Sequence, residues 1–139
     1  MTDRRRLAAN GRVATVDLIG IVEAERYNAG HEAQICLGVV DLCVEPKGAR
    51  ARQLLYGDEL IVYETLENYS FVQSQKDGYV GYVLNSAVRY KTLPKTHQVV
   101  VPLCHVYDAP DIKSKNLLQL TMGANILVSE ETQTFVKIK

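Results

Sequence analysis

The chain contains an internal repeat. Three segments of the first copy recur in the same order in the second: Asp41–Pro46 as His105–Pro110, Leu54–Val62 as Leu120–Val128, and Phe71–Val72 as Phe135–Val136. A further segment of the first copy, Asp77–Val83, has no counterpart before Lys139. A repeat is one structural unit seen twice, and a copy of roughly 55 residues is near the lower limit for independent folding. We therefore expect the copies to pack on one another, with the second copy incomplete.

Short apolar segments separated by turn residues predict an all-β fold. The segments with strand patterns are Val39–Val44, Glu59–Thr65, Tyr69–Ser74 and Tyr79–Leu84, and Asp17–Val22 is a further candidate near the start. Strands of this length at close spacing, with almost no helical period, are typical of a small barrel.

The turns between these segments favour a barrel of the SH3 type. Glu45–Leu54 is expected to be a long irregular loop, and Asp77-Gly78 predicts a type I′ hairpin turn. Asn85–Ala87 is expected to form a single 3₁₀ turn. Barrels of the SH3 type have this order of a long loop, three tight strands and a 3₁₀ turn.

The predicted fold class is all-β, with two small SH3-like barrels in tandem and the second incomplete at its C-terminal end. The expected division is a lead-in segment at 1–34, a first barrel at 35–91, a linker at 92–97 and a truncated second barrel at 98–139. Because the linker is short, we expect the two barrels to be in contact.

The charge balance argues against a nucleic-acid partner. The chain has 16 acidic and 16 basic residues and no formal net charge, whereas an RNA-binding barrel gains its affinity from clustered basic residues. The only basic run, Arg4–Arg6, is expected to be a solvated tail.

We expect a cytoplasmic protein without a membrane partner. Asn10-Gly11-Arg12 closely follows Leu7-Ala8-Ala9, so the start of the chain lacks the apolar stretch of a secretory signal. No segment approaches the ~18 apolar residues of a membrane span. An odd count of three cysteines fits reduced thiols rather than a disulfide framework.

Neither a catalytic cysteine nor a metal site is expected. Cys36, Cys43 and Cys104 all lie in apolar contexts, where a thiol is usually a small core residue with a raised pKa. Cys104 and His105 are adjacent, but neighbours on a strand point to opposite faces. The chain has no CxxC or HxxxH spacing for a metal. We expect no catalytic residue, no metal and no cofactor in this chain.

Tyrosines concentrate in the first copy. Six of the eight fall there: Tyr56, Tyr63, Tyr69, Tyr79, Tyr82 and Tyr90. Some should close a small core, but a tyrosine also has a polar tip that suits a shallow recognition groove. The first copy is therefore the expected binder.

Several segments together resemble the amino-terminal part of bacterial NlpC/P60 cysteine peptidases, of the γ-D-glutamyl-L-diamino acid endopeptidase or dipeptidyl-peptidase VI type. The matching stretches are Ala9–Ala14, Arg52–Asp58, Phe71–Gln73, Asp77–Val83, Thr96–Val99 and Tyr107–Asp111. They are spread over about residues 8–139, and their order makes the match more specific than any one alone. In that family, two bacterial SH3 (SH3b) barrels precede the peptidase domain.

The resemblance does not extend to the catalytic residues. The family's nucleophile lies in an Asp-Cys-Ser-Gly context, and no cysteine in this chain is followed by Ser-Gly. The catalytic domain is thus absent from the sequence, and we expect no peptidase activity from this chain itself.

The resemblance implies one binding site in the first barrel, for the free amine of a terminal L-alanine. Its carboxylate and its tyrosine match Glu45, before Pro46, and Tyr79, after Asp77-Gly78. A carboxylate and an aromatic hydroxyl or face suit an ammonium group. In the second copy Ala109 stands where the glutamate would be. The alternative is that Glu45 is a solvated loop residue and Tyr79 a packing residue.

Two functions remain open from the sequence. The first is a non-catalytic recognition and scaffold region of a hydrolase that recycles cell-wall (peptidoglycan) peptides and cleaves after γ-D-glutamate. Its partners would be the murein peptide and a C-terminal NlpC/P60 domain. The second is a stand-alone tandem SH3-like module for a peptide, a wall fragment or a protein, with a partner strand that completes the second barrel.

Overall fold

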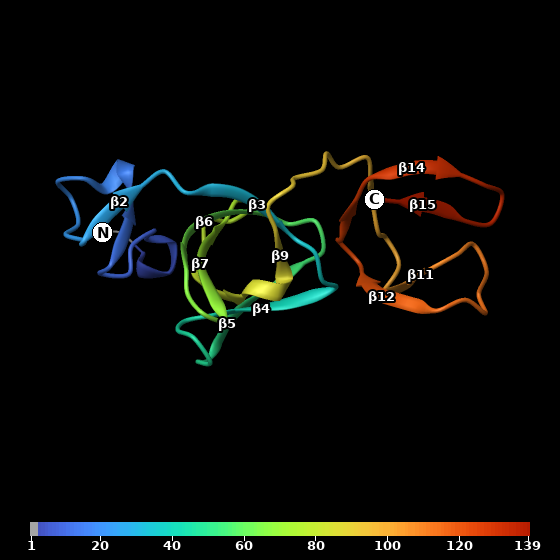
Figure 1. The fold of residues 1–139 in the computed structure, drawn as a ribbon, viewed down its shortest axis with the longest axis horizontal. Coiled ribbons are helices and arrows are strands. Elements are labelled where there is room, and N and C mark those ends of the chain that lie inside the picture. Colours follow the sequence, from blue (N-terminus) through green and yellow to red (C-terminus); the bar gives the residue numbers. More distant parts are fainter. Residues whose placement is uncertain (1–2) are drawn as a thin grey trace.

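The structure is a computed structural model that describes residues 3–139. Figure 1 shows three parts in chain order, a small N-terminal part, a curled central sheet and a C-terminal part. The N-terminal elements are η1 (Arg4–Arg6), β1 (Val13–Thr15), η2 (Val16–Leu18) and β2 (Arg26–Asn28). Strands β1 and β2 form a small parallel pair.

The strand predicted over Asp17–Val22 is wrong. The segment begins in the 3₁₀ helix η2 and continues as a turn that contains Gly20 at φ +83°. Ile19 and Ile21 are 62% and 75% exposed, so this apolar segment does not pack into a sheet.

A seven-stranded antiparallel sheet forms the central part. Its strands are β3 (His31–Ile35), β4 (Val39–Cys43), β5 (Arg50–Leu55), β6 (Glu59–Thr65), β7 (Tyr69–Ser74), β8 (Val80–Leu84) and β9 (Val88–Arg89). The order across the sheet is β5-β4-β8-β7-β6-β3-β9. The 3₁₀ helix η3 (Asn85–Ala87) lies between β8 and β9, as predicted. The first strand begins at His31, before residue 35, so it takes in the end of the lead-in segment.

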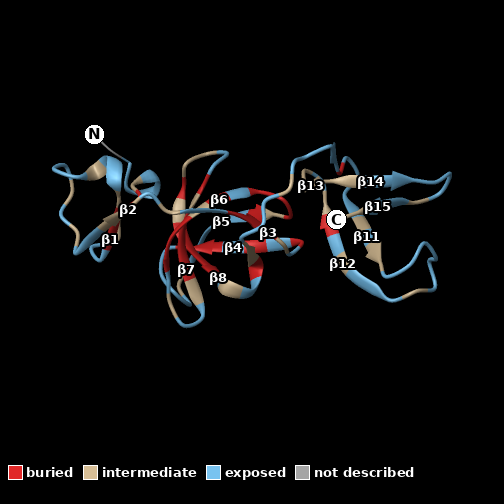
Figure 2. Ribbon diagram, turned by 45° about the horizontal axis from the view of Figure 1, so that its top comes forward, coloured by how far each residue is buried: buried red, intermediate tan, exposed pale blue. Residues whose placement is uncertain are grey.

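The sheet curls around one hydrophobic core, which confirms the all-β fold class. Alternate residues of the strands point inward, and those that are almost fully buried include Ile35, Leu42, Leu54, Leu60, Val72 and Val83. Figure 2 shows that buried residues concentrate in this central part. Burial of a side chain of this size contributes roughly 1.5–3 kcal/mol to folding, so the central sheet is the best-stabilised part of the molecule.

The segment Glu45–Leu54, predicted as irregular, is only partly so. β5 begins at Arg50 and pairs along β4, which leaves a short turn with Lys47 at φ +59°. The sequence does not reveal this strand because its first four residues are exposed and lack apolar alternation. Its hydrogen bonds to β4 define it instead.

The hairpin between β7 and β8 also differs from the expected type I′ turn. Only Gly78 has a positive φ, at +76°, and Asp77 does not. The Gly78 N–H donates to the Ser74 carbonyl oxygen at 2.9 Å, and Asp77 Oδ1 accepts from the Tyr79 N–H at 3.1 Å. The aspartate side chain thus organises a longer loop and places Tyr79 at its end.

The C-terminal part contains six short strands. They are β10 (His97–Gln98), β11 (Leu103–Tyr107), β12 (Asn116–Thr121), β13 (Asn125–Ile126), β14 (Val128–Glu131) and β15 (Val136–Ile138). The pairs are β10–β13, β11–β12 and β14–β15, all antiparallel.

Pairing in the C-terminal part follows the register of the central sheet. Leu103 of β11 pairs with Thr121 of β12, as Val39 of β4 pairs with Leu55 of β5. The register then shifts at the last residue of β11, as it does at the last residue of β4.

One part of the repeat differs from the sequence match by two residues. The Thr132 N–H donates to the Phe135 carbonyl oxygen as the Leu66 N–H donates to that of Tyr69. Phe135 therefore occupies the place of Tyr69 rather than that of Phe71. A shift of two residues keeps each side chain on the same face, so the apolar pattern alone does not distinguish the two registers.

The central and C-terminal parts are in contact, as the short linker predicts. The Asn125 N–H donates to the Tyr56 carbonyl oxygen at 2.9 Å. Tyr56 also packs in one buried cluster with Val99, Leu120 and Ala124. Within residues 3–139, the structure has no helix with the length and apolar character of a membrane span.

Candidate binding cleft

An open cleft of about 1210 Å³ lies between the N-terminal part and one side of the central sheet. Its walls come from the helix η1, from the turn that follows β4, and from the strands β5 and β8. The polar side chains along these walls include Arg4, Arg5, Glu45, Arg52, Tyr79 and Tyr82. The structure thus brings Glu45 and Tyr79, which were paired only by resemblance, to the walls of one cleft.

Glu45 lies in the tight turn between β4 and β5. Its carbonyl oxygen accepts from the Gly48 N–H at 2.8 Å, and a Cβ on Gly48 would lie 2.4 Å from the Glu45 Cγ. The side chain is exposed, and within the described residues 3–139 its carboxylate has no hydrogen bond or ion pair. It is therefore available to a ligand in the cleft.

Tyr79 is only 9% exposed and is surrounded by cations. The Arg52 guanidinium lies 3.9 Å from the ring centroid, and those of Arg6 and Arg5 lie at 5.2 and 5.5 Å. Interaction with Arg52 is the main cause that lowers the pKa of the Tyr79 phenol, and burial opposes it. Because guanidinium groups already cover the ring, a ligand ammonium would meet the hydroxyl of Tyr79 rather than its face. The roles of Glu45 and Tyr79 in ligand binding stay predictions.

The prediction of a solvated tail at Arg4–Arg6 is confirmed only in that all three residues are exposed. These residues form η1, in which Asp3 Oδ1 accepts from the Arg5 N–H at 3.0 Å. The Gln73 side chain also donates to the Arg6 carbonyl oxygen at 3.4 Å. The basic run thus forms a helical turn rather than an irregular tail, and Arg4 and Arg5 line the cleft. The sequence pattern gives no sign that Arg5 and Arg6 lie over the Tyr79 ring, which is more than 70 residues away along the chain.

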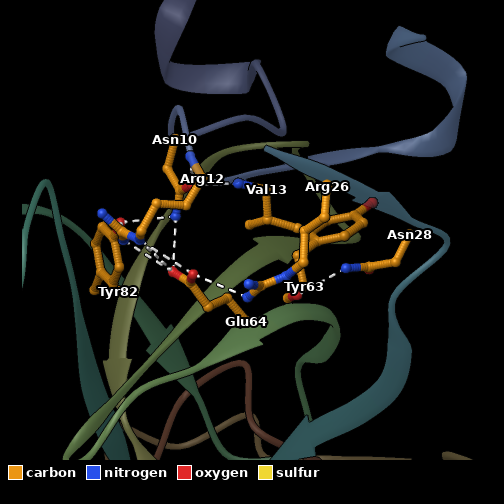
Figure 3. A network of polar contacts seen from close by, with 8 residues as sticks. All are labelled: Asn10, Arg12, Val13, Arg26, Asn28, Tyr63, Glu64 and Tyr82. Carbon is orange, nitrogen blue, oxygen red and sulfur yellow. Dashed lines mark hydrogen bonds and ion pairs between the residues drawn. The ribbon is translucent and has the colours of Figure 1, made fainter. Parts of the chain in front are cut away.

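A buried carboxylate attaches the N-terminal part to the sheet (Figure 3). Glu64 of β6, with its side chain only 3% exposed, accepts from Arg12 Nη2 at 2.9 Å and from Arg26 Nη2 at 3.1 Å. The Asn10 amide donates to Glu64 Oε1 and to the Tyr82 hydroxyl, both at 3.0 Å. These bonds lower the pKa of Glu64, with Arg12 as the largest cause. They hold the N-terminal part beside the cleft.

Cys36, Cys43 and Cys104 are all free thiols. Within residues 3–139, no thiol is hydrogen-bonded to a histidine ring: the Cys36 Sγ donates to the Ser86 carbonyl oxygen and the Cys104 Sγ to that of His105. The same residues include no group of three or more side chains suited to a metal ion.

Cys43 is expected to react most slowly of the three cysteines. Burial is the main cause that raises the pKa of its thiol, and the nearby Asp41 adds to it, so less thiolate is present at a given pH. Cys36 and Cys104 are partly exposed. Labelling with a thiol reagent at pH 8, followed by peptide mass spectrometry, should modify these two first. Fastest labelling at Cys43 in the folded protein would contradict the prediction.

The comparison with protein families agrees with the central fold. Residues 42–88 match a family model described as the bacterial dipeptidyl-peptidase Sh3 domain. The match runs from β4 to β9 and includes both Glu45 and Tyr79. Among curated proteins, none matches the chain. With the all-β sheet, the family match supports an SH3b region at residues 42–88 and, at this coarse level, a non-catalytic binding module.

Proposed function

We propose that this chain is the non-catalytic substrate-recognition and scaffold region of an NlpC/P60 hydrolase of cell-wall peptides. The parent enzyme would act in the cytoplasm on recycled murein peptides and cleave after γ-D-glutamate. Two SH3b barrels would belong to this region, the second in the C-terminal part. The first barrel would select peptides with a free N-terminal L-alanine through Glu45 and Tyr79.

One observation carries the proposal: Glu45 and Tyr79 both belong to the matched SH3b segment, and both line the same cleft. The unpaired carboxylate of Glu45 offers an ammonium a charge-assisted hydrogen bond, and the Tyr79 hydroxyl offers a second acceptor. A peptide whose first amine is blocked or still attached to the glycan lacks this cation. Recognition of the amine would therefore restrict the parent enzyme to trimmed peptides.

Replacing Glu45 with glutamine is expected to weaken binding of a free-amine peptide about tenfold, which corresponds to about 1.4 kcal/mol. The test is calorimetric titration of the full chain with L-alanyl-γ-D-glutamyl-L-lysine. The wild type should bind the N-acetylated peptide about as weakly as the variant binds the free amine. Glu23→Gln, which removes an exposed carboxylate outside this cleft, is the matched control. Equal affinity of the wild type for the free and acetylated peptides would refute the amine site.

A second function is favoured by a separate feature of the sheet. In the central part, β8 pairs with both β7 and β4. Within residues 3–139, the corresponding strands β15 and β11 have no strand between them. A stand-alone module that accepts a partner strand at this position would bind through main-chain hydrogen bonds. Binding of peptides irrespective of their amine, with protection of β11 and β15 amides from exchange, would favour this function.

A further inference from the structure

The cleft that contains Glu45 is predominantly cationic. Arg4, Arg5, Arg12 and Arg52 line it, and among the described residues Glu45 is its only acidic lining residue. Two of these charges are already balanced, because Arg12 pairs with Glu64 and Arg5 with Asp3 at 2.9 Å each. The charge that remains for a ligand comes from Arg4 and from Arg52, whose ion pair with Asp77 is long, at 3.9 Å.

Arg52 is the best placed of these side chains. It projects from β5, and its guanidinium carbon lies over the Tyr79 ring, 3.9 Å from the centroid. A cation–π contact of this kind does not consume the five N–H donors of the guanidinium. Its ion pair with Asp77 is long, at 3.9 Å, and the side chain is still 47% exposed. Arg52 is thus held in place while it retains donors for another group.

We propose that Arg52 forms a carboxylate-binding subsite in the same cleft as Glu45, so that the cleft recognises a peptide with a free amine and a nearby free carboxylate. The inference rests on the proposed function and names the second group that is recognised. A planar guanidinium binds a carboxylate through two parallel hydrogen bonds. Binding of an ammonium group alone would not account for a cleft whose lining side chains include four arginines and one glutamate.

A γ-linked glutamate at the second position has the required chemistry. Its peptide bond uses the side-chain carboxyl, so its α-carboxylate stays free and charged. This carboxylate is one residue away from the N-terminal amine, within ~7 Å even in an extended chain. Glu45 and Arg52 both line the cleft that would receive this end of the peptide.

The test uses two peptides that differ only at this carboxylate. The full chain is titrated with L-alanyl-γ-D-glutamyl-L-lysine and with its analogue in which the glutamate α-carboxylate is a carboxamide. We expect the wild type to bind the carboxylate form about tenfold more tightly, because a charge-assisted hydrogen bond is stronger than a neutral one. The difference should shrink as salt is raised, since the site is partly exposed.

The variant Arg52→Gln should lose this preference. Its affinity for the carboxylate peptide should fall about tenfold, while its affinity for the carboxamide should change less than twofold. Arg52→Lys, which keeps the charge but not the paired donors, should retain part of the preference. Arg50→Gln, on the same strand but outside the cleft, is the matched control. Thermal unfolding of each variant checks that the fold is intact.

The outcomes separate this inference from the proposed function. Equal binding of both peptides by the wild type, with the acetylated peptide still rejected, would overturn the subsite and leave the amine site in place. An equal loss for both peptides in Arg52→Gln would assign Arg52 a purely structural role. No binding of either peptide would overturn both proposals.

Discussion

Replacing Glu64 with alanine is expected to lower the free energy of unfolding by about 2 kcal/mol and to release the N-terminal part. Removing one partner of a buried ion pair costs about 3–5 kcal/mol, but the partners here, Arg12 and Arg26, are 47% and 57% exposed and are easily rehydrated. Chemical denaturation gives the stability change. Hydrogen exchange of residues 8–28 reports whether the N-terminal part is released.

Glu59→Ala is the matched control, because Glu59 is an exposed carboxylate on the same strand. It should change stability by less than about 0.5 kcal/mol. Equal effects of the two substitutions would mean that the network around Glu64 does not hold the N-terminal part.

The contribution of Glu64 should also depend on pH. Its pKa in the folded protein is lowered from the ordinary 4.5, so folding favours the charged form. The stabilisation is therefore fully present above pH 4.5 and is lost as the pH falls through the lower folded value. The stability difference between the wild type and Glu64→Gln should narrow on acidification below pH 4.5. A difference that stays constant down to pH 2 would contradict this assignment.

Replacing Gly57 with alanine is expected to displace the C-terminal part from the central sheet. The new Cβ would lie 2.1 Å from the Asn125 carbonyl oxygen, which is backbone and has little freedom to move. Overpacking of this kind costs about 1–3 kcal/mol, and the left-handed backbone at φ +84° adds about 1 kcal/mol. Amide exchange in residues 97–126 and the denaturation midpoint are the measurements.

Gly20→Ala is the matched control for the backbone term. Gly20 has nearly the same φ, +83°, but within residues 3–139 no atom would lie within 4 Å of a methyl group added there. It should show only the conformational cost and leave exchange in the C-terminal part unchanged. Gly38→Ala, whose Cβ would meet the Gln119 carbonyl oxygen at 2.1 Å without a positive φ, should reproduce the displacement. If all three variants behave alike, close packing between the parts is not what the glycines provide.

The strands with clear apolar alternation could be predicted from the sequence. Val39–Val44, Glu59–Thr65 and Tyr69–Ser74 correspond closely to β4, β6 and β7, because one face of each must be buried. β5 was missed for the opposite reason, since its first four residues are exposed. Asp17–Val22 was wrongly predicted because an apolar segment forms a strand only where another strand is available to pair with it.

The candidate site was only partly accessible from the sequence. The family resemblance named Glu45 and Tyr79 as candidates, and both line one cleft in the structure. Arg52 was overlooked, although it lies in a matching stretch, because its contact with Tyr79 joins β5 to the end of the β7–β8 loop. The pairing of Arg12 and Arg26 with Glu64 spans 52 and 38 residues of sequence, and no local pattern indicates it.

By itself, the sequence determined the all-β class, the internal repeat and the positions of most central strands. These follow from side-chain alternation and turn residues, which act over a few neighbouring positions. Only the tertiary structure decided the charge of the cleft, the burial of Glu64 and the position of Arg5 and Arg6 over the Tyr79 ring. Each of these depends on which distant side chains meet across the sheet, and electrostatic energy depends on distance in space rather than on separation along the chain.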